Sequence, residues 1–179
     1  MANTGMVFQA ELESIQGVLL LRLSNEISQA LPSRGMVMME GRINGLPITA
    51  PAEPDGRGSH FIIIPAELAD RAALRPGDHP DLVLSPAAIW PEPELPADFL
   101  AALTGSGLID RWQACTVRGR WEWLRWLRAT GNSETRQKRI SVACDKLRKG
   151  EKRPCCFNAA ACTVMEVSKS GILMDTWIG

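Results

Sequence analysis

The sequence predicts an α+β protein in which a small closed β-barrel with an internal two-fold repeat is followed by a C-terminal helical segment. In the first half, short apolar runs are separated by turn residues, which is typical of strands. In the second half, apolar residues recur at the spacing of a helix. Between them, residues 86–96 contain four prolines, which is typical of a stiff linker. We therefore expect a β-barrel domain over residues 1–88, a basic helical domain over 89–153 and an extension of uncertain structure over 154–179.

The first half indicates strands separated by sharp turns. Residues 6–14 alternate apolar and polar side chains, as in a strand with one buried face. Asn44-Gly45 is a strong signal for a two-residue hairpin turn. Ser24 or Asn25 is placed to cap a short helix that Pro32 ends. The expected strands are residues 6–14, 17–23, 36–43, 46–49, 60–64 and 81–85.

The order strand, short helix, turn and strand occurs twice in this half. Glu26-Ile27 in the first copy matches Glu67-Leu68 in the second, at a spacing of 41 residues. One copy of this size cannot bury its own apolar strand faces. We therefore expect the two copies to pack together as one closed barrel, which would leave no strand edge exposed.

The second half predicts helices over residues 97–103, 108–115, 120–130 and 133–149. In the third of these, Trp123, Leu124 and Leu127 form the centre of a broad apolar face. The fourth has a stripe of apolar side chains at the spacing i, i+3, i+4 and i+7. That stripe consists of Ile140, Ala143, Cys144 and Leu147. The last two helices should form a helical hairpin.

Charge is distributed unevenly along the chain. Residues 1–95 contain 6 Arg/Lys and 12 Asp/Glu, whereas residues 96–179 contain 14 and 8. On the last predicted helix, most of the basic residues lie opposite the apolar stripe, and the chain stays basic through Lys152 and Arg153. Such a surface suits an acidic protein or a nucleic acid, but it is equally typical of a solvated helix face over a tryptophan-rich core. The candidate binding residues are Arg136, Lys138, Arg139, Lys146, Lys149, Trp123 and Trp126.

Arg136 differs from these other bases because it lies beside the apolar stripe. A guanidinium in that position needs a carboxylate or carbonyl partner, since leaving a buried charge unpaired costs about 3–5 kcal/mol. We expect a salt bridge to Glu122 that ties the two helices together, with anion binding as the alternative.

The sequence offers few groups for catalysis. It has two histidines, no tyrosine and no glycine-flanked Ser or Cys nucleophile. His60 and His79 flank one strand–helix–strand unit, where exposed strand-end positions are more common than a catalytic pair. The Gly-rich loop at residues 52–59 is followed by a strand, whereas a phosphate-binding loop is followed by a helix. We expect no enzymatic activity and no cofactor.

Cysteine usage is typical of a reducing cytosol. There are five cysteines, an odd number, and all of them follow residue 114. They lie far along the chain from both histidines, so we expect no metal site. The adjacent Cys155-Cys156 pair would be redox-active if Lys152 or Arg153 lowers a thiol pKa. We expect a cytoplasmic protein, monomeric or weakly homo-oligomeric, without a secretory signal or a membrane span.

Several segments, taken in order, resemble a known family. They are FQAELES, GRINGLP, HFIIIPAEL, LRPGD, ELPADFLAAL and SETRQKRI, and the resemblance covers roughly residues 6–153. Together they resemble the bacterial YdeI/OmdA-like, or bacteriocin-protection, family, whose N-terminal barrel domain has no known function. The IIIPAEL and RPGD segments are also more distantly similar to the double-split barrel of AbrB-type regulators, in which two chains each supply half.

The resemblance implies a small barrel joined to a helical tail, with no established activity and no agreed catalytic residues. It also implies a loose association with stress resistance. The hypothesis is therefore a non-enzymatic binding or stress-protection protein that uses the basic hairpin. A nucleic-acid-binding protein and a small-molecule-binding barrel are the alternatives. The chain departs from the family pattern after Pro154, where residues 164–167 and 172–178 are either a strand with a docking segment or a loose tail.

Overall fold

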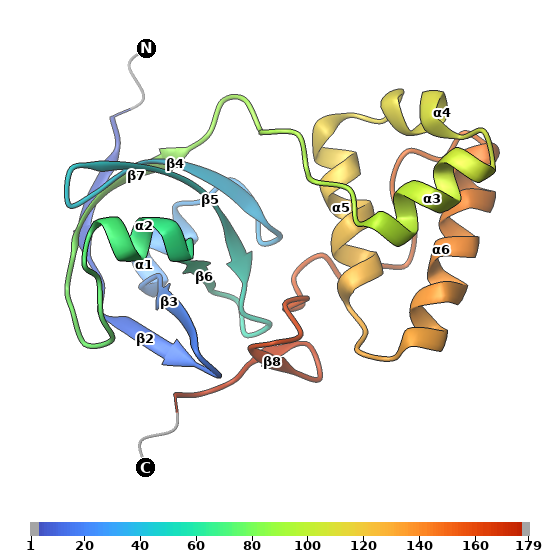
Figure 1. Cartoon of the computed structure of the whole chain (residues 1–179). Helices are drawn as coiled ribbons and strands as arrows, with labels where there is room; N and C mark the ends of the chain where they lie inside the picture. Colours follow the sequence, from blue (N-terminus) through green and yellow to red (C-terminus); the bar gives the residue numbers. More distant parts are fainter. Residues whose placement is uncertain (1–3, 177–179) are drawn as a thin grey trace. The chain divides into compact units, whose positions relative to one another are not determined.

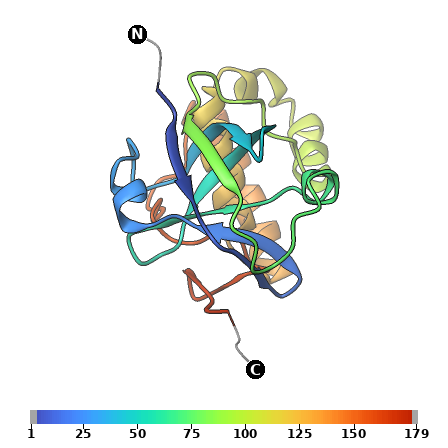
Figure 2. The same cartoon turned by 90° about the vertical axis from the view of Figure 1, so that its left-hand side faces the viewer.

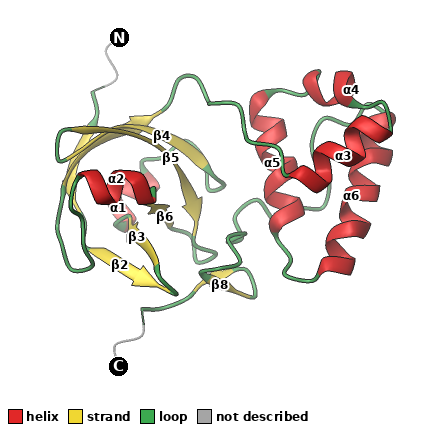
Figure 3. Ribbon diagram, in the orientation of Figure 1, coloured by secondary structure: helices red, strands yellow, loops and turns green. Residues whose placement is uncertain are grey.

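The computed structural model describes residues 4–176, and their contacts divide the chain into two units. The first unit contains the chain up to Ala88 together with Ala159–Cys162 and the stretch from Glu166 onward. The second contains Ile89–Asn158 and Thr163–Met165. Strands dominate the first unit and helices the second (Figure 3). The predicted α+β class is confirmed.

The first unit is an antiparallel seven-stranded sheet that curls into an open half-barrel (Figure 1). Its strands are β1 Met6–Gln9, β2 Leu12–Ile15, β3 Val18–Arg22, β4 Val37–Ile43, β5 Leu46–Pro54, β6 His60–Ile63 and β7 Asp81–Pro86. Their spatial order is β1-β7-β4-β5-β6-β3-β2. The short helices α1 Asn25–Gln29 and α2 Ala66–Arg71 follow β3 and β6 along the chain.

The predicted closed barrel is not what the structure shows, because no pairing joins the edge strands β1 and β2 within residues 4–176. Only Ala10 and Glu11 separate these strands, so the chain runs from one sheet edge to the other. β1 lies beside β7 (Figure 2). At the start of β2, the Leu12 amide donates to the Asp78 carbonyl at 2.8 Å, and the Gly77 amide donates to the Leu12 carbonyl at 2.7 Å. A turn therefore supplies the partner that a closing strand would have supplied.

Local signals explain most of these elements. Asn44 and Gly45 have φ values of 46° and 79°, which is the left-handed backbone that a type I′ turn between β4 and β5 requires. The Ser24 hydroxyl accepts from the Ile27 amide at the start of α1. The strand–helix–strand order occurs as β3–α1–β4 and β6–α2–β7, and β3 pairs with β6 while β4 pairs with β7. The two-fold relation between the copies stays a prediction.

The core of the first unit lies on the concave side of the curled sheet and under the two short helices. Alternate strand positions supply it, as the two-residue strand period requires. Leu21, Ile43, Ala52 and Leu82 are completely inaccessible to solvent. They pack in one cluster with side chains such as Leu68 of α2.

The second unit is a helical domain with its own core. Its helices are α3 Ala97–Gly105, α4 Ile109–Gln113, α5 Val117–Arg128 and α6 Ser133–Arg148. The predicted apolar stripe of α6 is buried against α3, α4 and α5. The core is formed by Phe99, Leu103, Leu108, Trp112, Cys115, Trp123, Leu127, Ile140, Ala143, Cys144 and Leu147.

The C-terminal stretch ends in a small hairpin that belongs to the first unit. It consists of β8 Ser168–Lys169 and β9 Ile172–Leu173. Val167 and Leu173 are buried, and the Leu173 amide donates to the Asp55 carbonyl at 2.9 Å. The segment up to Thr176 is therefore docked. The strand predicted at residues 164–167 is wrong, because a turn occupies residues 165–167 and β8 follows it. Of the predicted docking segment 172–178, residues 177 and 178 lie outside the described residues.

Candidate functional site

The predicted helical hairpin is formed by α5 and α6, each with a side-chain cap. The Thr116 hydroxyl accepts from the Gly119 amide at 3.0 Å, which places the start of α5 three residues earlier than predicted. The Asn132 side-chain carbonyl accepts from the Thr135 amide at 2.8 Å at the start of α6. These caps satisfy amides that the first turn of a helix leaves free.

The two tryptophans among the candidate binding residues lie in or against the core. Trp123 is 0% exposed. Trp126 is half-buried, and its ring meets that of Trp123 edge-on, with 5.9 Å between the centroids. The Arg139 guanidinium lies over the Trp126 ring at 5.4 Å and donates to the Trp126 carbonyl at 2.6 Å. Arg139 therefore covers the face of Trp126 and holds the end of α5 against α6.

Arg136 pairs with Asp98 of α3, so the predicted salt bridge to Glu122 is wrong. Its Nε and Nη2 donate to the two Asp98 oxygens at 2.6 and 2.9 Å, and its Nη1 donates to the Leu127 carbonyl at 3.3 Å. Glu122 instead accepts from the fully buried Arg125, one turn along α5, at 3.2 Å. The Arg136 guanidinium also lowers the pKa of the Asp98 carboxyl.

The remaining candidate lysines differ in how well they are neutralised. Lys138 lies 3.2 Å from Glu134, and Lys146 donates to Glu151 at 2.9 Å. Lys149 is exposed at the end of α6, and the exposed Lys152 and Arg153 follow it. Within residues 4–176, no carboxylate pairs with these last three. We name Lys149, Lys152 and Arg153 the cationic segment.

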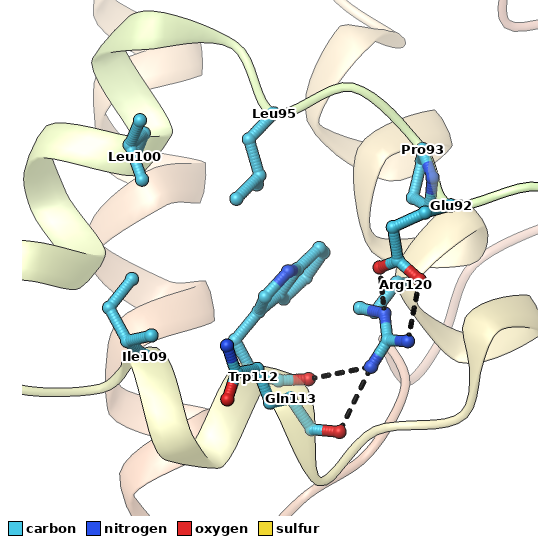
Figure 4. A pocket seen from close by; sticks show the side chains of 8 residues that line it. All are labelled: Glu92, Pro93, Leu95, Leu100, Ile109, Trp112, Gln113 and Arg120. Carbon is cyan, nitrogen blue, oxygen red and sulfur yellow. Dashed lines mark hydrogen bonds and ion pairs between the residues drawn. The ribbon is translucent and has the colours of Figure 1, made fainter.

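A pocket of about 470 Å³ lies elsewhere in the helical unit, between the start of α3, α4 and α5 (Figure 4). Leu95, Leu100, Ile109 and Trp112 give it apolar walls. At its polar end Arg120 forms a two-pronged ion pair with Glu92, at 2.5 and 2.8 Å.

Arg120 is only 9% exposed and also donates to the carbonyls of Gln113 and Cys115, at 3.0 and 2.6 Å. The sequence contains a signal for its position. Arg120, Trp123 and Leu127 are spaced i, i+3 and i+7, which puts a guanidinium in line with the buried face of α5.

The two histidines contact different residues. His60 is 1% exposed, with Nδ1 2.7 Å from the Ser28 hydroxyl and Nε2 2.8 Å from the Gly35 carbonyl. His79 is exposed, and its Nε2 lies 3.9 Å from Glu11. In the described part of the chain, no three potential metal ligands among His, Cys, Asp and Glu come together.

None of the helices that the structure describes combines the length and the apolar character needed to cross a membrane.

Comparison with protein families gives two matches. Residues 92–150 match the OmdA model, described as "Bacteriocin-protection, YdeI or OmpD-Associated". Residues 8–84 match a domain of unknown function, DUF1905. No curated protein matches the chain. The first match covers the four helices with both the pocket and Lys149, and the second covers nearly the whole seven-stranded sheet.

Proposed function

Because the chain carries a bacteriocin-protection YdeI/OmdA domain over residues 92–150 and a DUF1905 domain over residues 8–84, we propose a non-enzymatic stress-protection protein that binds an acidic partner protein. The proposed binding surface is the cationic segment. The proposal places the protein in the cytoplasm, which its five free cysteines support because thiols stay reduced there.

The observation that carries the proposal is the group of exposed cations at the end of α6 that pair with no carboxylate among residues 4–176. Lys138 and Lys146 are each paired with a glutamate, so part of their charge is neutralised within the protein. Lys149, Lys152 and Arg153 keep theirs. Three such charges within five residues favour a polyanionic surface and accelerate its encounter with the protein.

The tryptophans favour an acidic protein over a single-stranded nucleic acid. Proteins that bind single strands combine basic residues with exposed aromatic rings on which bases stack. Here the Trp123 ring is buried and the Arg139 guanidinium covers Trp126. The two tryptophans predicted as binding residues therefore offer no open ring face for stacking.

A binding titration tests this proposal with a fluorescein-labelled polyglutamate peptide as the probe. We expect the triple variant Lys149→Glu, Lys152→Glu, Arg153→Glu to lose at least about tenfold in affinity, since each lost charge contact is worth a few tenths to 1 kcal/mol. The matched control reverses Arg42, Arg71 and Arg75, three exposed arginines of the first unit, and changes the net charge equally. Equal losses in both variants would contradict a local binding surface.

The same titration with a single-stranded oligonucleotide separates the two kinds of partner. If a nucleic acid is the true ligand, its phosphates release counterions on binding. The affinity for the oligonucleotide should then fall steeply between about 50 and 200 mM salt. We expect weak binding that does not exceed that of the peptide. Tighter, strongly salt-dependent oligonucleotide binding that the triple variant abolishes would overturn the proposal in favour of nucleic acid.

The pocket beside Arg120 supports small-molecule binding as a second candidate function. Its volume falls within the range of about 300–1,000 Å³ that is usual for ligand sites, and it combines apolar walls with one charged end. It lies in the helical unit, whereas the sequence suggested a small-molecule-binding barrel. The ligand that fits has an apolar body and a carboxylate that competes with Glu92 for Arg120.

A thermal-shift screen of amphipathic carboxylates tests this second function. A true ligand stabilises the folded protein by RT ln(1 + [L]/Kd), so the melting temperature keeps rising as the ligand concentration is raised. Ile109→Trp should fill the pocket and abolish the shift, whereas Ile172→Trp, on an exposed position of the first unit, should leave it unchanged. A shift that persists in Ile109→Trp would place the ligand elsewhere.

A further inference from the structure

The end of α6 folds back on its own last turn. Gly150 has φ 86°, and the amides of Gly150 and Glu151 donate to the carbonyls of Leu147 and Lys146, each at 3.0 Å. This pattern is a Schellman motif, in which a left-handed glycine reverses the chain. The reversal returns the residues after Gly150 to the side chain of Lys146.

Two adjacent thiols lie where the chain returns. The Lys146 ammonium donates to the Cys155 sulfur at 3.0 Å and to Glu151 at 2.9 Å. Cys156 is the next residue along the chain. Both cysteines are exposed, whereas Cys115, Cys144 and Cys162 are buried.

The electrostatic environment separates Cys155 from the buried thiols. The Lys146 ammonium, and after it the neighbouring Cys156 thiol, lower the pKa of the Cys155 thiol, whereas partial desolvation and the Glu151 carboxylate oppose them. Burial raises the pKa of Cys115 and of Cys144. The sequence suggested Lys152 or Arg153 as the activating base, but the contacting residue is Lys146, which the Schellman turn brings into place.

We propose that Cys155 and Cys156 form a peroxide-sensitive modification site, in which Cys155 is the reacting thiolate, Cys156 resolves it and Lys146 is a positioning residue. Three features carry this inference: an ammonium in hydrogen-bond contact with one sulfur, a second thiol on the adjacent residue, and solvent access to both. The site lies outside the cationic segment and does not depend on the function proposed above.

The chemistry needs one hydroperoxide, ROOH, for each pair of thiols. The Cys155 thiolate attacks the distal peroxide oxygen, the O–O bond breaks, and the leaving alkoxide takes a proton to give ROH and a sulfenic acid on Cys155. Cys156, as its thiolate, then attacks the Cys155 sulfur. The S–O bond breaks and the departing hydroxide takes up a proton, which leaves a disulfide and water. Two electrons pass from the two thiols to the peroxide.

The disulfide formed should be readily reversible. Adjacent Cα atoms are about 3.8 Å apart across a trans peptide bond, which is shorter than the span of about 4.4–6.8 Å usual for disulfides. A bond closed over this span is strained, and strained exposed disulfides are reduced easily by cellular thiols. The expected behaviour is a site that responds to peroxide and recovers.

The role of Lys146 is tested by measuring the rate of Cys155 alkylation by iodoacetamide as a function of pH, with peptide mass spectrometry as the readout. Lys146→Gln should move the midpoint of this profile to higher pH and slow alkylation at neutral pH by about threefold or more, because a lower thiolate fraction outweighs its higher intrinsic reactivity. Lys149→Gln removes an equal charge that does not contact the thiol and should leave the midpoint in place. An unchanged profile in Lys146→Gln, or equal shifts in both variants, would overturn the inference.

The resolving role of Cys156 is tested by treating the whole protein with hydrogen peroxide. The wild type should lose two hydrogen masses on the peptide that contains both cysteines, and dithiothreitol should restore them. Cys156→Ser should instead accumulate a sulfenic acid on Cys155 that dimedone traps, while Cys155→Ser should form neither product. Oxidation that starts at one of the buried cysteines, or a wild type that stops at the sulfenic acid, would contradict the assignment.

Discussion

His60 shows how a single buried polar residue can hold a turn in place. Both of its ring nitrogens have partners, Ser28 in α1 and Gly35 in the segment before β4. The Arg34 guanidinium also donates to the Ser28 carbonyl. One imidazole therefore connects β6 to the loop that follows α1.

Replacing His60 with alanine should lower the free energy of unfolding by about 2–3 kcal/mol. The change leaves the Gly35 carbonyl and the Ser28 hydroxyl without a buried partner and opens a cavity. Urea denaturation at pH 7 measures the effect. The control is His79→Ala, at an exposed position, which should change the value by less than about 0.5 kcal/mol. Similar losses for both variants would show that the buried connection adds little.

At the Asp98–Arg136 pair, the prediction concerns pH. The pKa of Asp98 is lower in the folded protein than its ordinary value of 3.8. Asp98 therefore contributes to the free energy of unfolding above pH 3.8, and this contribution is lost as the pH falls through the lowered pKa. Asp98→Asn should therefore cost about 0.5–1 kcal/mol at pH 7, a value that reflects partial exposure. The cost should shrink toward pH 3. Chemical denaturation at the two pH values checks this, with the exposed Asp110→Asn as the control.

At the scale of the elements, the close approach of β4 and β7 depends on one glycine. A Cβ on Gly41 would lie 1.9 Å from the Val83 carbonyl oxygen, which is far inside contact distance. At Gly45, in the turn between β4 and β5, a Cβ meets no atom within 4 Å. Gly41 is therefore required by the lack of space between the strands, whereas Gly45 is required by its left-handed backbone.

Gly41→Ala should thus destabilise the protein much more than Gly45→Ala. The first change forces β4 and β7 apart and should cost about 3 kcal/mol or more, as overpacking between strands does. The second should cost about 1 kcal/mol, for an alanine held at positive φ. Thermal unfolding of both variants gives the comparison. A larger loss for Gly45→Ala would show that the strand contact relaxes easily.

Short-range signals predicted most of the elements correctly. Asn44-Gly45 marked the first hairpin, and Asn132 marked the start of α6. These signals act within a few residues, so a single sequence contains them. The open sheet edge was missed because the alternation over residues 6–14 gives no sign of the break at Ala10–Glu11.

The candidate site was harder to predict, because its geometry depends on contacts between helices. The helical wheel placed Arg136 beside the core, but it could not identify the carboxylate that pairs with Arg136. That carboxylate belongs to Asp98, which lies 38 residues away on another helix. The spacing of Trp123 along the helix is the same for a core residue and for a residue that binds a partner. Its burial follows from the packing of the four helices, which a single sequence does not show. Lys146 and Cys155 come together through the left-handed turn at Gly150, which periodicity does not reveal.

At the scale of the whole molecule, the C-terminal stretch contributes to both units. Cys162, Val167 and Leu173 are buried with the first unit, and the Arg22 guanidinium donates to the Met174 carbonyl at 2.7 Å. Thr163 belongs to the helical unit, where its hydroxyl accepts from Arg128 Nε at 3.1 Å.

Leu173→Ala should therefore lower the unfolding free energy by about 2–4 kcal/mol, the cost of a large-to-small change at a fully buried site. Ile172→Ala, the neighbouring exposed position, should change it by less than about 1 kcal/mol. Hydrogen exchange should become faster at Asp55–His60 in the first variant, because Leu173 donates to the Asp55 carbonyl. Unchanged exchange there would mean that the hairpin docks without stabilising this loop.

The path of the chain limits how this protein can be divided. The polypeptide passes between its two units at four places, after Ala88, Asn158, Cys162 and Met165. The matched family segments end at residues 84 and 150, so neither includes the stretch that completes the sheet unit. An exchange of residues 1–88 with those of a relative would combine the new sheet with a β8–β9 hairpin that did not evolve with it. The halves are therefore expected to be inherited together with the tail, rather than shuffled as independent modules.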